Sequence, residues 1–363
     1  MRIDPLMLLL PLLSPMFMTS AVQSSDTHPD LSGTYNVATL TPLERPTALG
    51  DRATFTEAEA TEIAAYWQSS LAKDGETSNP DRDAPPAGGV RAAVPEFEGA
   101  AGKVGGYNAF YVDIGSSAFK LDGAYRTSII TSPANGQMPS ISQAGRRRFA
   151  QHPHNQLDEH ENTGDAWWID LPFGPFDHPE MRPLGERCIL GFGSTAGPPA
   201  LPVMYNNLKR IVQTEDYVII HNEMNHDTRI IPVNETGNRT PDTNKEPKWL
   251  GNSAGQWEGN TLLVTTRGFR DKRGDWMGSP SMVVEERFSR IDDKTLRYAF
   301  TVTDPDTWES SWSGEYPWPS TDERLFEYAC HEGNYSFTGI LKGARVLEAE
   351  ARSAHRSAPI AGD

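Results

Sequence analysis

Short segments of alternating polar and apolar residues dominate the chain from residue 187 onward, and they constrain the fold more than any other feature. They are rich in β-branched and aromatic residues and recur at roughly 8–12-residue intervals, from a first expected strand at 187–192 to the last two at 324–329 and 335–341. Tight connections such as Glu258-Gly259-Asn260 predict antiparallel neighbours. About eight or nine strands leave two exposed edges unless the sheet closes. We therefore expect a mainly β fold, an antiparallel lipocalin-like β-barrel over residues 187–345.

The segments on either side of this β region are of a different kind. Residues 26–186 predict an N-terminal arm of polar loops packed on the barrel, with one helix. Thr56 and Glu59 have the spacing of a capping box, and the apolar residues that follow at helical spacing predict a helix over 57–72. Frequent Pro, Gly and Ala between 75 and 106 predict an irregular stretch. Residues 346–363 are small and polar and predict a disordered tail.

Residues 1–25 have the features of a signal peptide. Arg2 precedes a mostly apolar stretch from Leu6 to Met18, after which small residues follow. This stretch is shorter than the roughly 20 apolar residues of a membrane-spanning helix. We therefore expect an exported protein, periplasmic or secreted, with no membrane span once the signal peptide is removed.

The charge of the chain argues against a nucleic-acid partner, and its lack of glycine-rich motifs argues against a cofactor. The 363 residues include 49 acidic and 33 basic side chains, which gives a formal net charge of −16. Because no diffuse positive field surrounds such a chain, we expect no nucleic-acid partner. The chain also lacks a glycine-rich phosphate loop and a Gly-x-Gly-x-x-Gly fingerprint. We therefore expect no cofactor, and a small molecule as the substrate or ligand.

Cys188 and Cys330 are the two cysteines of the chain. A disulfide between them would close a long loop and would persist in an oxidising compartment. Two separate buried thiols, each packed as a small hydrophobic side chain, are an equal alternative. The sequence leaves both alternatives open.

The densest cluster of titratable groups is the segment Glu223–Arg229, which lies between two β-type runs. Strand alternation would place Glu223, Asp227 and Arg229 on one face, with His226 opposite unless a turn re-aims it. A histidine titrates near neutral pH, and a neighbouring carboxylate fixes its tautomer and raises its basicity. We therefore take His226, Asp227 and Glu223 as catalytic candidates and Arg229 as a substrate-binding candidate. The alternative is a solvated hairpin tip with surface ion pairs.

A second polar cluster spans Glu327–Tyr335, near the end of the β region. A disulfide between the two cysteines would fasten this cluster beside Arg187, so that both polar clusters could share one cavity mouth. We take His331 as a further catalytic candidate, and Glu332 and Arg187 as substrate-binding candidates. Polar residues that satisfy backbone groups at a strand end are the alternative.

Three other sets of residues have functional and structural interpretations. Tyr205 and Asn207 are of the types that orient a substrate in an apolar pocket, although either can be structural. Glu286 and Arg287 fit a cross-strand ion pair better than a catalytic role. The tryptophans either line a ligand cavity with aromatic faces or belong to the core; the late cluster comprises Trp308, Trp312 and Trp318.

A histidine-rich segment contains the residue types of a metal site. His152, His154, Asp158 and His160 occur within a polar stretch. Their spacing matches no specific metal-binding motif, so we expect no metal.

Several motifs together resemble a large family of exported bacterial proteins, mostly of unassigned function, that is frequent in acidobacteria and sphingomonad-type proteobacteria. The matching segments cover about residues 31 to 345: Pro42-Leu-Glu-Arg-Pro46, Gly105-Gly-Tyr-Asn108, Glu186-Arg-Cys-Ile189, Tyr205-Asn-Asn207, Glu223-Met-Asn-His-Asp-Thr-Arg229, Trp257-Glu-Gly-Asn-Thr-Leu262 and Glu327-Tyr-Ala-Cys-His-Glu-Gly-Asn-Tyr335. The resemblance implies a lipocalin-like β-barrel but no established mechanism. Thr228 stands where the family more often has alanine, and Asn260 where it more often has aspartate.

The chemistry of these clusters favours an enzyme that needs no cofactor. A base, an acid and a cation suffice for elimination or isomerisation, and the chain has no obvious covalent nucleophile. We expect a periplasmic lyase, dehydratase or isomerase acting on a small, partly apolar substrate, aromatic or sugar-like, in the barrel cavity. A non-catalytic lipocalin-like binding protein and a structural envelope protein are the alternatives.

Overall fold

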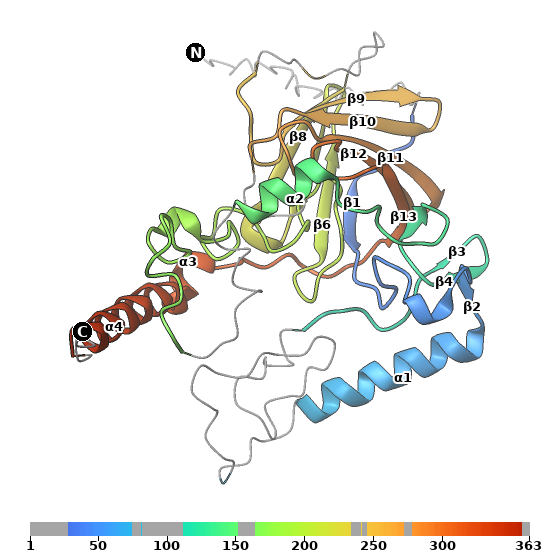
Figure 1. The fold of residues 1–363 in the computed structure, drawn as a ribbon. Coiled ribbons are helices and arrows are strands. Elements are labelled where there is room, and N and C mark those ends of the chain that lie inside the picture. Colours follow the sequence, from blue (N-terminus) through green and yellow to red (C-terminus); the bar gives the residue numbers. More distant parts are fainter. Residues whose placement is uncertain are drawn as a thin grey trace, which may run out of the picture.

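The structure of the protein, a computed structural model, describes residues 28–74, 81, 112–151, 164–233, 241, 245–271 and 278–357. The fold of these residues is mainly β, and the strands within each sheet pair antiparallel, as the alternating segments predict (Figure 1). The expected signal peptide, nearly all of the irregular stretch at 75–106 and the histidine-rich segment at 152–160 lie outside the described residues.

Two larger sheets form the body of the fold. The four-stranded sheet has the order β1-β6-β7-β8, with bounds Gly33–Asn36, Leu208–Gln213, Tyr217–Asn222 and Thr228–Pro232. The six-stranded sheet has the order β5-β13-β12-β11-β10-β9, with bounds Ile130–Ser132, Trp312–Pro319, Thr295–Thr303, Val283–Asp292, Thr261–Arg267 and Asn252–Glu258. A small sheet has the order β2-β4-β3, with bounds Thr54–Phe55, Ala124–Arg126 and Lys120–Leu121.

The two larger sheets meet through single bridges. Tyr35 in β1 bridges Ser320, which follows β13, and Val233, which follows β8, bridges Gly255 in β9. No ladder of paired strands joins the two sheets in the described ranges, so the closed barrel that the sequence predicts is not confirmed there.

Strands from the N-terminal arm belong to both larger sheets. β1 pairs with β6, and β5 pairs with β13. The structure therefore differs from the expected division into an arm at 26–186 and a barrel at 187–345. The expected first strand at 187–192 is a series of turns, because Cys188 has a φ of 56°, which extended backbone does not allow.

The inward faces of the two sheets share one core. Leu296, Tyr298, Phe300 and Val302 alternate along β12, and each is at most 2% exposed. The rings of Tyr298 and Trp318 have centroids 4.8 Å apart. The late tryptophans are all buried, and they belong to this core: Trp308, Trp312 and Trp318.

Four α-helices lie within the described residues: α1 (Glu57–Asp74), α2 (Gln143–Ala150), α3 (Cys330–Gly333) and α4 (Tyr335–Ser357). The capping box predicted at the start of α1 is confirmed. The Thr56 backbone N–H donates to Glu59 Oε2 at 2.8 Å, and the Glu59 N–H donates to Thr56 Oγ1 at 3.2 Å.

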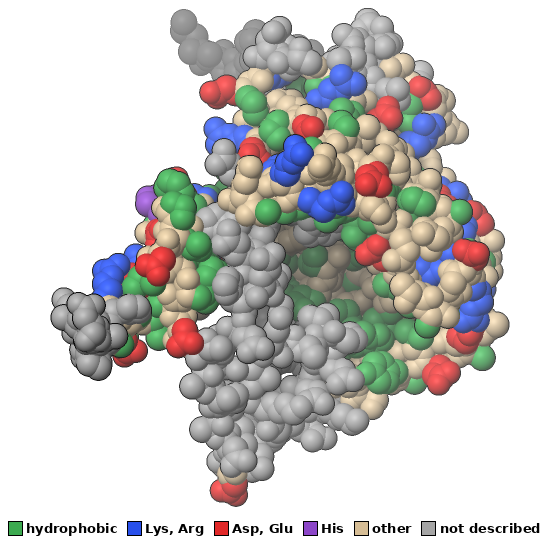
Figure 2. All heavy atoms as spheres, viewed as in Figure 1, with side chains coloured by type: hydrophobic (Ala, Val, Ile, Leu, Met, Phe, Trp, Pro, Cys, Tyr) green, Lys and Arg blue, Asp and Glu red, His purple; other side chains and the backbone are tan. Residues whose placement is uncertain are grey.

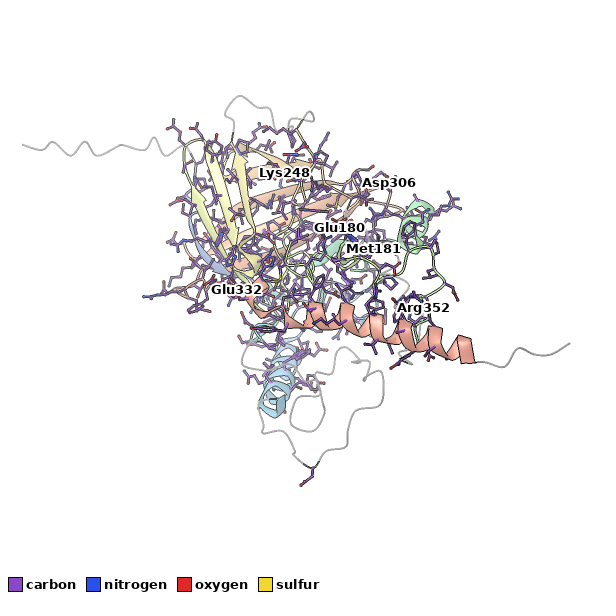
Figure 3. All side chains as sticks on the ribbon, turned by 90° about the vertical axis from the view of Figure 1, so that its left-hand side faces the viewer. Glu180, Met181, Lys248, Asp306, Glu332 and Arg352 are labelled. Atoms are coloured by element: carbon purple, nitrogen blue, oxygen red, sulfur yellow. A yellow bond between two sulfur atoms is a disulfide. The ribbon has the colours of Figure 1, made fainter. Side chains whose placement is uncertain are left out.

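α4 differs from both expectations for this part of the chain, a strand at 335–341 and a disordered tail from 346. Ala344, Leu347 and Ala351 recur at helical spacing and pack on a satellite cluster around Trp168. The Trp168 indole N–H also donates to Glu348 Oε1 at 2.9 Å. The tail is therefore helical as far as Ser357 because one face of it has a partner. Figure 3 shows α4 extending away from the sheets between Glu332 and Arg352.

Side chains of every type occupy the face of the molecule in Figure 2, where hydrophobic residues gather in a central hollow. None of the helices in the described ranges combines the length and the hydropathy that a membrane span requires.

Candidate functional site

The cluster Glu223–Arg229 comprises the tight connection between β7 and β8 and the first two residues of β8. A 3-10 turn, η5 (Met224–His226), occupies its centre, and Asn225 and His226 both have positive φ, of 57° and 53°. Asp227 anchors this turn, because its Oδ2 accepts the Gly191 N–H at 2.9 Å. The turn changes the alternation of the strand, so the cluster does not share one face as an extended segment would.

Glu223 and His226 both bind the backbone of a distant segment. Glu223 Oε1 accepts the Phe326 N–H at 3.0 Å, and His226 Nε2 accepts the Tyr328 N–H at 3.0 Å. An imidazole nitrogen that accepts a hydrogen bond carries no proton, so this contact assigns the proton of neutral His226 to Nδ1. We call residues 321–330 the strap, which runs from the end of β13 to α3 (Figure 1).

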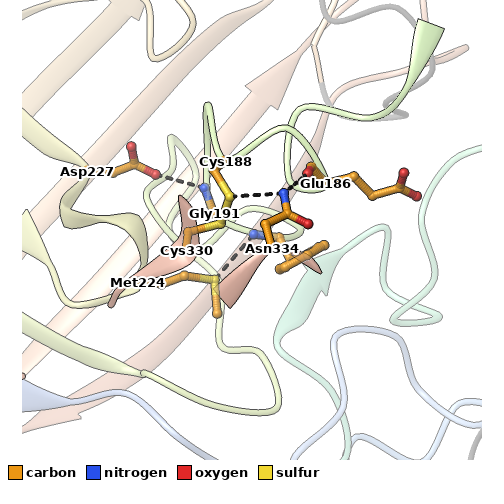
Figure 4. The surroundings of a disulfide bond; sticks show 8 residues. Glu186, Cys188, Gly191, Met224, Asp227, Cys330 and Asn334 are labelled. Atoms are coloured by element: carbon orange, nitrogen blue, oxygen red, sulfur yellow. Dashed lines mark hydrogen bonds between the residues drawn. A yellow bond between two sulfur atoms is a disulfide. The ribbon is translucent and has the colours of Figure 1, made fainter. Parts of the chain in front are cut away.

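The far end of the strap is held by a disulfide. Cys188 and Cys330 are bonded, with Cα atoms 5.7 Å apart, which decides between the two alternatives that the sequence leaves open. Asn334 reinforces this junction, because its Nδ2 donates to the Glu186 carbonyl at 2.7 Å and contacts Cys188 Sγ at 3.5 Å (Figure 4). The disulfide fastens the second polar cluster beside the Glu186–Arg187 segment, as the sequence argument expects.

The candidates on the second cluster do not enter an enclosed site. His331 and Glu332 lie in α3 and are exposed, and Arg187 is partly exposed. Asn207 is buried and holds a loop: its Oδ1 accepts the Val203 N–H at 2.9 Å, and its Nδ2 donates to the Asp113 carbonyl at 2.7 Å. Tyr205, two residues earlier, is partly exposed.

Arg229 lies between the two sheets, where it forms a buried ion pair with Glu286. Its Nη1 donates to Glu286 Oε1 at 2.9 Å and its Nη2 to Oε2 at 2.5 Å. The Tyr298 hydroxyl also donates to Glu286 Oε1, at 2.9 Å. Burial alone would lower the pKa of Arg229, but the Glu286 carboxylate more than offsets it, and the pKa is raised. Glu286 thus pairs with Arg229 and not with its neighbour Arg287.

Lys209 is a buried cation that the sequence argument missed. Its side chain is 1% exposed, and its Nζ donates to the Thr195 carbonyl and to Asn222 Oδ1. Burial, together with the nearby Arg229 charge, lowers its pKa from 10.5 to about 7. The alternation along β6 is the available signal, since Lys209 lies two residues before Ile211 and so shares its buried face.

Ser253 occupies a Gly-x-Ser-x-Gly pattern, Gly251-Asn-Ser-Ala-Gly255. The nucleophile of this motif stands on a sharp turn between a strand and a helix. Ser253 instead lies within β9, and its Oγ is 2.8 Å from Thr266 Oγ1 on the neighbouring strand. The local structure is therefore not that of a nucleophile elbow.

An open groove of about 960 Å³ lies between the strap and the outer face of the four-stranded sheet. The sheet side and the neighbouring β11–β12 turn contribute Gly33, Thr34, Arg210, His221 and Lys294, and the strap side contributes Ser320, Thr321, Asp322, Glu323, Arg324 and Leu325. The strap is therefore one wall of the groove. None of the sequence-based candidates lines it.

His221 presents a basic nitrogen at this groove. The Thr228 hydroxyl donates its single proton to the His226 carbonyl at 3.0 Å, so it accepts from His221 Nδ1 at 2.8 Å. This pair of bonds assigns the proton of neutral His221 to Nδ1 and leaves Nε2 with a free lone pair. Burial, and to a smaller extent the nearby His226, lowers the pKa of His221.

The strand register places His221 beside a cation. Arg210 in β6 is directly opposite His221 in β7, and Thr228 in β8 is opposite His221 on the other side. Arg210 makes no side-chain hydrogen bond or ion pair with a described residue, and the same is true of Lys294 and Arg324. The groove thus combines a histidine with cations whose side chains form no ion pair with a described residue.

The described residues contain no group of three or more His, Cys, Asp or Glu side chains that could hold a metal ion. The candidates His152, His154, Asp158 and His160 lie outside those residues.

No protein-family model matches the chain. A comparison with curated proteins also finds no significant relative.

Proposed function

We propose that the protein is a cofactor-independent lyase, dehydratase or isomerase that performs acid–base chemistry on a small substrate in the groove beneath the strap. His221 is the general base in this proposal. The observation that carries it is the hydrogen-bond chain from His221 Nδ1 through the Thr228 hydroxyl to the His226 carbonyl, which leaves Nε2 unprotonated.

The catalytic candidates from the sequence, His226, Glu223 and Asp227, have a positioning role in this proposal. His226 Nε2 and Glu223 Oε1 both accept backbone N–H groups of the strap, and Asp227 accepts a backbone N–H from Gly191. A nitrogen engaged in this way has no free lone pair for proton abstraction. We propose that these side chains hold the strap and the β7–β8 turn, and so position the groove around His221.

A binding function without catalysis is the second candidate, and one cleft favours it. This cleft has a volume of about 360 Å³ and a mainly apolar lining that includes Leu40, Leu43, Trp67 and Leu201. Its volume and lining are of the kind that bind small apolar ligands. A binding protein of this kind would take an apolar molecule in the cleft and would leave it chemically unchanged.

The proposal also includes a lipocalin-like fold and an exported location. The bridges at Tyr35–Ser320 and Val233–Gly255 support a lipocalin-like arrangement in which the two sheets wall one core. The disulfide supports an oxidising compartment, and we propose the periplasm or the exterior of the cell. The motif resemblance supports membership of the exported bacterial family.

Deuterium exchange separates the two candidate functions. An acid–base enzyme exchanges the acidic C–H proton of its substrate in D₂O, and NMR would detect this in a panel of hydroxy acids, sugar acids and aromatic acids. We expect exchange with the wild type, and its loss in His221→Gln. His178→Gln, at an exposed histidine elsewhere in the chain, is the matched control and should retain the activity. Exchange that is equal in wild type and His221→Gln would overturn the assignment of the base.

A further inference from the structure

We infer that the substrate of this groove is a carboxylate-bearing sugar, a uronate within a short saccharide, and that the reaction is β-elimination. The inference rests on the proposed function, because it uses His221 as the base. It goes further by naming the chemical class of the substrate and the bond that breaks.

The cations of the groove are the first argument. Arg210, Lys294 and Arg324 line it together, from β6, from the turn between β11 and β12, and from the strap. Much of the chain's other arginine charge is paired, as in Arg52 with Glu59 and Arg182 with Glu186. In a chain of net charge −16, cations that converge on one groove and form no ion pair with a described residue favour an anionic ligand. A carboxylate also matches the planar fork of an arginine.

The polar lining of the groove is the second argument, because it distinguishes a sugar from an aromatic substrate. Thr34, Ser320 and Thr321 contribute hydroxyl groups, and Leu325 is the one large apolar side chain among the lining residues. No Phe, Tyr or Trp is among the described residues that line the groove, so a planar apolar substrate would have no such ring to stack on. Its volume of about 960 Å³ is close to the upper end of ordinary ligand sites, which leaves room for more than one sugar ring.

The carboxylates on the strap are consistent with this choice. Asp322 and Glu323 lie on the wall opposite the sheet, and Glu323 Oε1 accepts the Thr321 hydroxyl at 3.1 Å. Carboxylates repel a substrate carboxylate but accept hydrogen bonds from sugar hydroxyls. The groove therefore combines cations, on the sheet at Arg210 and on the strap at Arg324, with carboxylate acceptors on the strap, which suits a molecule that has both an anionic group and hydroxyl groups.

The elimination needs only groups that the groove or the solvent supplies. His221 Nε2 takes the proton from the carbon next to the substrate carboxylate, and that C–H electron pair becomes a carbon–carbon double bond. The C–O bond at the neighbouring carbon breaks, and the leaving oxygen takes a proton from the solvent that fills the open groove. Arg210 stabilises the negative charge that develops on the carboxylate. The products are an unsaturated uronate and an alcohol, with no change in overall oxidation state.

Calorimetric binding tests the substrate class independently of turnover. The probes are di- and trisaccharides of galacturonate, glucuronate and mannuronate, with neutral galactose, glucose and mannose oligomers of equal length as controls. We expect at least one uronate to bind the wild type, and no neutral oligomer to bind comparably. Arg210→Gln and Arg324→Gln should each weaken binding about tenfold or more, since each removes a charge-assisted hydrogen bond. Arg267→Gln, at an exposed arginine of β10 outside the groove, should leave it unchanged.

The two levels of the proposal fail separately. If no uronate binds more tightly than its neutral counterpart, the substrate class is overturned, whatever exchange the enzyme shows on other molecules. If a uronate binds through Arg210 but forms no unsaturated product and exchanges no proton, the elimination and the proposed function are both overturned, and the groove is an anion-binding site. The conjugated double bond of the product can be monitored by its ultraviolet absorbance. The substrate class and the proposed function are both supported if His221→Gln abolishes formation of this double bond and leaves uronate affinity within about twofold of the wild type.

Discussion

The Nε2 atom of His226 lies 3.0 Å from the backbone nitrogen of Tyr328, a contact between residues 102 positions apart in the sequence. With the bond from Phe326 N–H to Glu223, it fastens the middle of the strap to the β7–β8 turn. Beyond the bond from the Thr321 N–H to the Thr34 carbonyl of β1, side-chain acceptors such as these hold the strap. The histidine is thus a structural clamp on the wall of the groove.

Replacement of this clamp should loosen the strap locally. In His226→Ala the Tyr328 amide loses its acceptor, and we expect its hydrogen exchange to accelerate about tenfold, as befits a hydrogen bond worth about 1 kcal/mol or slightly more. Amide exchange measured by mass spectrometry on a peptide covering the strap would detect the change. Glu223→Gln, which keeps an oxygen acceptor for Phe326, is the control and should change this peptide less. Unaltered exchange at Tyr328 in His226→Ala would contradict the clamp.

Removal of the disulfide should destabilise the whole chain. The Cys188–Cys330 bond spans 142 residues, for which the chain-entropy argument gives an upper value of about 5 kcal/mol. We expect the double variant Cys188→Ser/Cys330→Ser to unfold at a clearly lower urea concentration than the oxidised wild type. Reduced wild-type protein is the matched control and should behave like the double variant. A midpoint equal to that of the oxidised protein would show that the bridge contributes nothing.

Because Arg229 and Glu286 form a buried pair, we expect substitutions of the two residues to have strongly non-additive effects on the free energy of unfolding. Arg229→Leu leaves the Glu286 carboxylate buried without its partner, and we expect a loss of about 3–5 kcal/mol in the free energy of unfolding. The double variant Arg229→Leu/Glu286→Leu removes both charges and should recover much of that loss. Urea unfolding of both single variants and the double variant completes the cycle. Additive losses would mean that the two side chains do not interact as the structure indicates.

Local sequence patterns predict the hairpins of this fold because each is formed by neighbouring residues. The Glu258-Gly259-Asn260 connection turns β9 into β10, and Gly259 has the positive φ of 58° that such a turn favours. The capping box of α1 is equally local. The pairing of β1 with β6 joins residues such as Tyr35 and Lys209, which no short motif connects. In α4 the helical spacing of Ala344, Leu347 and Ala351 is a local signal, but the partner of this face, Trp168, is distant in sequence.

The residues of the candidate site also differ in whether a local sequence pattern indicates them. The density of titratable groups draws attention to Glu223–Arg229, which contacts the strap through Glu223 and His226. The groove histidine, His221, carries no local signal, since an isolated histidine in a strand fits many roles. Its importance depends on the strand register that places it between Arg210 and Thr228. Register of this kind is a property of the folded sheet.

Buried Lys209 predicts a dependence of stability on pH. Its pKa is lowered from 10.5 to about 7 on folding, so between these values the unfolded chain binds more protons than the folded chain at this residue. The contribution of Lys209 to the free energy of unfolding therefore rises with pH in this range, by up to about 1.4 kcal/mol per pH unit. We expect wild type to gain stability relative to Lys209→Met as the pH rises above about 7. Urea unfolding at several pH values measures this difference. A difference in the free energy of unfolding between wild type and Lys209→Met that does not change with pH would show that the Lys209 ammonium group is solvated and not buried.

His221 predicts the acid limb of the pH–activity profile. Burial and the neighbouring His226 lower its pKa below its usual 6.5, so the imidazole is neutral, and able to accept a proton, at neutral pH. For the substrate found by exchange or binding, kcat/KM should therefore stay constant near neutral pH and fall only below about pH 6.5, with a slope of one proton. Thr228→Val removes the hydroxyl that accepts from His221 Nδ1, so it should lower kcat more than it raises KM while the fold remains intact. Because the hydroxyl fixes the tautomer, Thr228→Ser should restore most of the activity, whereas a variant that is merely unstable would not be rescued in this way. An acid limb unaffected by His221→Gln would assign the base to another group.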